Sequence, residues 1–147
     1  MFGILEYFIK NDPSITNKAD NFGYTNLHYA VTANRPQVCE LLIKLGFDVN
    51  VRSNDGSTPL HIAVIYGLQM FVEILLEHGA NIDAEDINGY IPLMFAIHYN
   101  KISMAKFLIQ KGASLKKRNI HNWTPLEIAL EAKNFEIALM IPYLSSE

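Results

Sequence analysis

The sequence contains a single cysteine, Cys39, among its 147 residues. One cysteine cannot form an intramolecular disulfide or supply the several thiolates of a cysteine-based zinc site. The first residues, MFGILEYFIKND, lack the basic start and the small-residue cleavage site of a secretory signal peptide. No apolar run approaches the ~18 residues that span a membrane. These absences favour an intracellular, soluble protein, and they do not distinguish cytoplasm from nucleus.

Excess charge and catalytic motifs are also lacking. The formal net charge is -3, so nothing global favours nucleic acid as a partner. The sequence contains no phosphate-binding loop, no nucleophile elbow and no paired-histidine motif on a predicted helix. Half of the residues are hydrophobic, which is the balance of a globular protein. We expect a single globular domain that is not an enzyme, has no catalytic or metal site and needs no cofactor.

Glycines recur at a fixed interval of 33 residues along the chain. They form two series, Gly23, Gly56 and Gly89, and Gly46, Gly79 and Gly112. The next step of the first series reaches Asn122, a residue type that also tolerates left-handed backbone angles. Four related segments follow these positions: YTNLHYA, STPLHIA, YIPLMFA and WTPLEIA. Repetition at this interval predicts an array of stacked units.

Each unit reads as two short helices. In residues 53–85, Thr58 suits the N-cap and Pro59 the first helical position, before an apolar stripe at helical spacing. A second apolar segment, LQMFVEILLEHG, ends at Gly79. Isolated helices of about two turns are marginal in water, so one unit must pack against the next.

The unit resembles the ankyrin repeat. The resemblance implies an all-α solenoid of stacked antiparallel helix pairs with projecting turns or β-hairpins. We expect one domain over residues 1–147, with a partial repeat at 1–19, full repeats at 20–52, 53–85 and 86–118, and a last repeat at 119–147. In the partial repeat, Leu5, Phe8 and Ile9 take the places of Val38, Leu41 and Leu42.

The third and fourth units depart from this pattern. Met94 and Glu127 stand where the family has the histidine found here as His28 and His61, which the resemblance makes a structural residue. Ile91 replaces threonine and cannot cap, so the third unit should have a weaker helix start. Cys39 is expected to be a packed, inert thiol. Asn50 occupies a position that is hydroxylated in some ankyrin arrays, and its modification stays open.

Ankyrin repeats usually bind partners on the concave side, which the turns and the first helices form. Carried onto this chain, the candidate partner-binding residues are Phe22, Tyr24, Ile65, Tyr66, Ile87, Tyr90, His98, Tyr99, Ile120, His121 and Trp123. Aromatic side chains are frequent in this set, and they are the usual anchors of protein interfaces. The alternative is that some of them pack against neighbouring turns within the array.

Charge differs between the two central units. Residues 53–85 carry acidic residues without lysine or arginine, whereas residues 86–118 carry five lysines and one arginine against Asp86. Stacking should therefore pair Glu73 with Lys106 and Lys44 with Glu77. The alternative is that KKRNIH offers a basic patch to an acidic partner.

We therefore expect a module that binds a protein or peptide as adaptor, inhibitor or targeting arm, with no nucleic acid and no membrane insertion. The alternative is an architectural or spacer segment of a larger protein or assembly, without a dedicated ligand on the concave side. Both ends are apolar, with FEIALMIPYL near the finish, where Pro142 should cut the helix short. We expect at least one end to be covered, by self-association, by a partner or by sequence absent from this chain.

Overall fold

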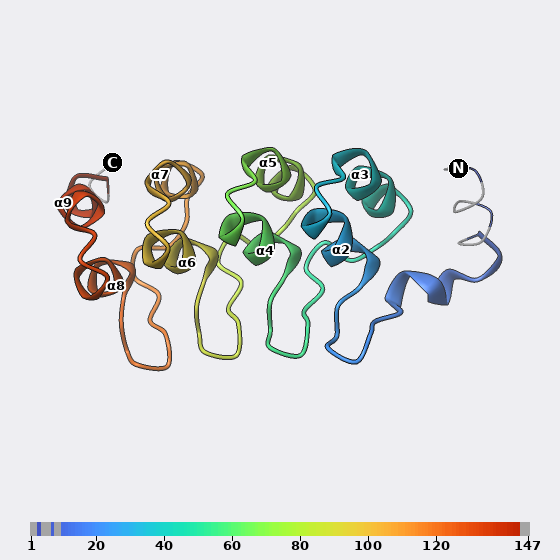
Figure 1. Ribbon diagram of the computed structural model, residues 1–147, viewed down its shortest axis with the longest axis horizontal. Helices are drawn as coiled ribbons and strands as arrows, with labels where there is room; N and C mark the ends of the chain where they lie inside the picture. The colour runs from blue at the N-terminus through green and yellow to red at the C-terminus, as the bar shows by residue number, and fades with distance from the viewer. Residues whose placement is uncertain (1–2, 4–6, 8–9, 145–147) are drawn as a thin grey trace.

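The computed structural model describes residues 3, 7 and 10–144, and within them the chain forms helix pairs in a single row (Figure 1). After a 3-10 helix, η1 (Pro13–Asn17), the pairs follow in chain order. They are α2 (Asn26–Thr32) with α3 (Pro36–Lys44), α4 (Pro59–Ile65) with α5 (Gln69–Glu77), α6 (Pro92–His98) with α7 (Ile102–Gln110), and α8 (Pro125–Glu131) with α9 (Phe135–Leu144). The first helices form one layer and the second helices another, and the connecting turns project beyond the first layer (Figure 1). The predicted all-α solenoid is confirmed.

Each first helix begins after a residue in extended conformation, and in two units the side chain of that residue caps the helix. Thr58 accepts a bond from the backbone N–H of His61, and Thr124 accepts one from Glu127, both at 3.4 Å. At Ile91 no side chain caps the helix, as predicted for the third unit. Each first helix has only seven residues, so its stability depends on packing against its neighbours.

The repeated leucine and alanine positions form the centre of the stack. Leu27, Leu60 and Leu93 are buried, and so are the alanines at the fixed position, Ala30, Ala63, Ala96 and Ala129. A small side chain there lets neighbouring first helices approach closely. On the second helix of residues 53–85, Phe71, Val72 and Leu75 are also buried. Each first helix thus buries its apolar residues against the second helix of its own unit and against the neighbouring units.

The projecting turns are closed by backbone bonds. In the second unit, the N–H of Ser53 donates to the carbonyl of Ser57 at 2.9 Å. Gly56 has a positive φ of 80°, and a Cβ there would lie 2.7 Å from the backbone nitrogen of Ile87 in the next turn. Only glycine fits so close an approach. The one β-bridge in the part of the chain that the structure describes joins Ala19 to Thr25, so these turns contain no extended strands.

Single backbone bonds also link each turn to the next. The N–H of Asn54 donates to the carbonyl of Phe22, Ile87 donates to Asp55, and Ile120 donates to Asn88, at 2.8 to 3.0 Å. These bonds hold the four turns side by side, which fixes the surface that they present.

Three expectations about charges and ends need correction or lie outside the structure. Neither Glu73 with Lys106 nor Lys44 with Glu77 forms an ion pair; Lys106 instead reaches forward to Glu136 at 3.5 Å. The helix α9 continues through Pro142 to Leu144. Pro142 lies two residues before the end of this helix, so the backbone bond that a proline cannot make belongs to the last turn. The expected core residues of the partial repeat, Leu5, Phe8 and Ile9, lie outside the described residues.

Candidate partner-binding surface

Four exposed aromatic residues, Phe22, Tyr29, Tyr66 and Tyr99, lie in the turns or on and directly after the first helices. Phe22 and Tyr66 are among the most exposed large side chains, at 70% and 60% of their full accessible area, and Tyr99 reaches 53%. Tyr66 and Tyr99 directly follow α4 and α6, where each helix ends. Tyr24, Tyr90 and Trp123 are half-buried and pack against the core. Burying exposed aromatic surface is favourable, so this side of the array is suited to covering by another molecule.

Four of the predicted residues line one hollow, which we call the N-terminal groove. It lies between the first two units and has a volume of about 340 Å³. Its lining includes the predicted Phe22, Tyr24, Ile65 and Tyr66. Tyr29 also lines it and donates a hydrogen bond from its hydroxyl to the carboxylate of Asp20.

Four others line a second hollow, the C-terminal groove, of about 300 Å³. Its predicted members are Tyr90, His98, Tyr99 and His121. Phe95 lies among them, with its ring stacked on that of Tyr99 at 6.3 Å and tilted against Tyr90 at 5.1 Å. The rings therefore support one another as well as facing solvent.

The remaining three predicted residues do not join these grooves. Ile87 and Ile120 are exposed, but they line a third hollow of about 640 Å³, together with charged side chains such as Arg52 and Lys117. Trp123 lies beside His121, with ring centroids 5.5 Å apart. The structure thus divides the predicted surface into two aromatic grooves and a separate pair of isoleucines.

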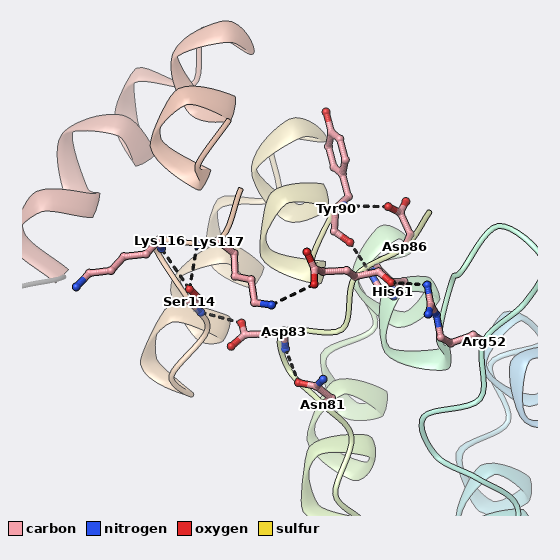
Figure 2. Close-up of polar contacts among 10 residues, drawn as sticks. Arg52, His61, Asn81, Asp83, Asp86, Tyr90, Ser114, Lys116 and Lys117 are labelled. Carbon is pink, nitrogen blue, oxygen red and sulfur yellow. Dashed lines mark hydrogen bonds and ion pairs between the residues drawn. The ribbon is translucent and has the colours of Figure 1, made fainter. Parts of the chain in front are cut away.

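Polar contacts between units join several residues that line the third hollow or lie beside it (Figure 2). The Nη2 of Arg52 donates to the carbonyl of Glu85 at 2.9 Å, and the Nζ of Lys117 pairs with the Glu85 carboxylate at 3.1 Å. The backbone N–H of Ser114 donates to Asp83 at 2.8 Å. The predicted basic cluster is therefore partly engaged within the array, since Arg118 also pairs with Glu127 at 3.3 Å.

Two family models match this chain. One, described as ankyrin repeats in three copies, matches residues 1–86, and the other, described as ankyrin repeats in many copies, matches residues 75–129. The chain belongs to the ankyrin repeat family. Ankyrin repeats generally act in protein–protein interactions and are known as a non-enzymatic fold. A comparison with curated proteins gave no match.

The ankyrin histidines tie adjacent turns together. In His61 the Nδ1 accepts the backbone N–H of Thr58 at 3.1 Å, so the proton resides on Nε2, which donates to the carbonyl of Tyr90 at 3.0 Å. His28 makes the same contacts with Thr25 and Ser57. Burial lowers the pKa of both imidazoles, although the carbonyls that they contact oppose the shift. Neutral, fully bonded rings of this kind have a structural role.

The other candidate side chains also have structural roles in the ankyrin array. Cys39 is fully buried, and its burial raises the pKa of the thiol to about 11, which makes it unreactive. The side chain of Asn50 donates to the carbonyl of Gly79 at 3.2 Å and accepts the N–H of Asn81 at 2.7 Å. No group of histidine, cysteine and acidic side chains among the described residues could hold a metal ion. None of the described helices has the length and apolar character needed to cross a membrane.

Several residues that line the grooves were not predicted as partner-binding, among them Tyr29, Asp55 and Phe95. Tyr29 and Phe95 occupy the same position of the ankyrin unit, where the second unit has the buried Ile62. An aromatic residue at that position in two of the units was a signal that could have been used. Asp55 flanks the turn glycine, as Phe22 does in the first unit, but it is not among the predicted partner-binding residues.

Proposed function

We propose that this ankyrin array is a module that binds a protein or peptide across its concave side, as an adaptor, inhibitor or targeting arm. The observation that carries the proposal is the pair of grooves lined by exposed tyrosine and phenylalanine side chains on the turns and first helices. A large exposed aromatic side chain is costly to leave in water and gains most from burial at an interface. The free and buried thiol of Cys39 suits an intracellular setting, in cytoplasm or nucleus.

The test uses Tyr66 and Tyr99, because each is exposed and follows the end of a first helix, where truncation disturbs packing little. The full chain is immobilised, and captured proteins are identified by mass spectrometry and then measured singly by calorimetry. Hot-spot truncations cost about 2 kcal/mol or more, so Tyr66→Ala with Tyr99→Ala should weaken binding roughly 30-fold or more.

A matched control changes exposed apolar residues on the second helices. Met70→Ala with Phe135→Ala removes comparable surface from α5 and α9 and should leave binding unchanged. Circular dichroism should show equal helicity in all variants. A partner that binds the tyrosine variant as tightly as the wild type would contradict the concave assignment.

A second, architectural function is favoured by the surface of the last unit. Leu130 is 50% exposed, although Val31, Val64 and Ile97 at the same position of the other units are fully buried. Leu139 is 71% exposed. It occupies the repeat position that Lys106 holds in the third unit, where the lysine side chain pairs with Glu136 of the next unit. We propose that this surface mediates self-association.

Light scattering across a concentration series tests this second function. The wild type should gain mass with concentration, and Leu130→Lys with Leu139→Lys should stay monomeric, because two charges oppose burial of that surface. The matched control, Met70→Lys on α5, should associate as the wild type does. A wild-type protein that is monomeric at every concentration would exclude self-association.

A further inference from the structure

The N-terminal groove combines aromatic walls with negative charge. Phe22, Tyr29 and Tyr66 expose ring surface around it, and Ile62 and Ile65 supply its aliphatic part. Asp55 lines it directly, and Asp20 lies at its edge, bonded to the hydroxyl of Tyr29. Among the described residues, neither a lysine nor an arginine lines the groove. Its charged groups therefore have one sign.

The charge of this groove persists at neutral pH. Although partial burial opposes it, hydrogen bonds from Ser53 and Ser57 lower the pKa of Asp55 below its usual value. His28, at the inner wall, has a pKa lowered by burial, so it stays neutral and does not offset the carboxylates. Burial and the charges of Asp55 and Asp20 raise the pKa of the Tyr24 hydroxyl, so both carboxylates act on the interior of the groove.

We infer that the N-terminal groove binds an arginine side chain of a peptide or protein partner, and this inference rests on the proposed function. A guanidinium is planar, weakly hydrated and always charged, so it can stack on the tyrosine and phenylalanine rings while pairing with Asp55. The methylene stem of the same side chain would lie along Ile62 and Ile65. The volume of about 340 Å³ is at the small end of ligand-binding hollows and suits one large side chain rather than a folded element.

Arginine is favoured over lysine by the walls of the groove. An ammonium group is compact and strongly hydrated, and it gains little from flat rings that remain partly in water. The exposed faces of Phe22 and Tyr66 match the plane of a guanidinium better. An apolar side chain of similar length would leave the charge of Asp55 unpaired, because Ser53 and Ser57 supply hydrogen bonds but no positive charge.

The experiment titrates the isotope-labelled full chain with three small probes and follows its backbone amide signals by nuclear magnetic resonance. The probes are Nα-acetyl-arginine amide, Nα-acetyl-lysine amide and Nα-acetyl-norleucine amide, which differ in the group at the end of the side chain. We expect the arginine probe to bind in the millimolar range, because a single side chain makes few contacts. Shifts should concentrate at Phe22, Asp55 and Tyr66, with weaker effects from lysine and least from norleucine.

Two variants and one control make the assignment specific. Asp55→Asn keeps an oxygen to accept the bonds from Ser53 and Ser57 but removes the charge, and it should weaken arginine binding about fivefold to tenfold. Tyr66→Ala should weaken it about tenfold, through loss of a stacking face. Glu77→Gln removes the same charge from α5 and should leave the affinity unchanged.

Equal shifts from arginine and norleucine, or unchanged binding by Asp55→Asn, would overturn the inference. Failure of the inference is distinguishable from failure of the proposed function. A captured partner that depends on Tyr66 and Tyr99, together with no saturable binding of the arginine probe, would retain the module and reject arginine. Arginine binding without any partner that depends on those tyrosines would reject the proposed function.

Discussion

The junction between the second and third units differs from the junction between the third and fourth. At the former, His61 is fully buried and joins the helix start at Thr58 to the carbonyl of Tyr90. At the latter, Met94 occupies the same position and is equally buried, but a thioether makes neither bond. At this position, buried hydrogen bonds of His61 join the second and third units, whereas the third and fourth units are joined by apolar packing of Met94. We call the His61 bonds the polar tie.

The later junction has other polar contacts, which lie nearer the surface. Lys106 pairs with Glu136, and Arg118 with Glu127, through side chains that are 42 to 57% exposed. Exposed ion pairs contribute only about 0–1 kcal/mol each. Asn134 adds one buried bond, from its Nδ2 to the carbonyl of Ile97 at 3.3 Å. Units of one sequence pattern are thus joined by different sets of bonds, and we expect the junction between the third and fourth units to be the weaker.

The largest effect should follow from removing the polar tie. His61→Ala leaves the carbonyl of Tyr90 without this donor and opens a cavity in the core, so we expect a loss of about 2–4 kcal/mol in the free energy of unfolding. Urea denaturation at pH 7 measures it. Met94→Leu, a change of shape without polar atoms, serves as the control and should cost less than about 1.5 kcal/mol. Equal losses in the two variants would show that the two junctions do not differ.

Acid should weaken the histidine junctions before it affects the carboxylates. The folded-state pKa of His28 and of His61 lies below the usual value, mainly through burial, so the unfolded chain binds more protons. The contribution of these histidines to the free energy of unfolding is therefore fully present above about pH 6.5. It falls as the pH drops below that value, by at most about 1.4 kcal/mol per pH unit for each histidine.

Urea denaturation between pH 7 and pH 5 measures this dependence. The lowered pKa values of Asp20 and Asp55 lead to losses only below about pH 4, outside that range. The double variant His28→Met with His61→Met should lose most of the slope. If the free energy of unfolding of the wild type did not change between pH 7 and pH 5, the stabilising role of the neutral, buried His28 and His61 would be contradicted.

A smaller effect should follow from building the tie where it is missing. Ile91→Thr with Met94→His restores both the cap and the imidazole of the earlier junctions, and the carbonyl of Trp123 is the equivalent acceptor. We expect a gain of about 1 kcal/mol, because net hydrogen-bond and capping contributions are of that size and both replaced residues are buried.

Hydrogen exchange tells where that gain appears. Amides of α8 and α9 should exchange more slowly in the double variant than in the wild type, while those of α4 should change little. Faster exchange in α8 would mean that the lost apolar packing of Ile91 and Met94 outweighs the new bonds.

The sequence predicted the array and its core because the 33-residue interval places equivalent residues in equivalent surroundings. Leu60, Ala63 and Phe71 are buried as expected, and Ile91 lacks a cap as expected. The predicted ion pairs were wrong, because the long Lys106 side chain pairs with Glu136 of the following unit rather than with Glu73 of the preceding one. Register alone does not tell which of two neighbouring units a long side chain reaches.

The candidate site was predicted less completely than the fold. Its exposed tyrosines follow from register, and the structure places Tyr66 and Tyr99 at equivalent helix ends. The separation of Ile87 and Ile120 from the aromatic grooves depends on which way each turn residue faces, and that direction is set by contacts between turns. Asp55 was missed because its importance comes from the rings that the first unit places beside it.

The bonds between units cross sequence distances close to the length of one unit. His28 and Ser57 are 29 residues apart, Asn50 and Asn81 are 31 apart, and Arg52 and Glu85 are 33 apart. A contact network that repeats with the length of one unit survives duplication or deletion of a whole unit, because each copy still meets a neighbour of the same kind. Unequal recombination between units could therefore lengthen or shorten the array within a gene, adding or removing a groove without disturbing the others.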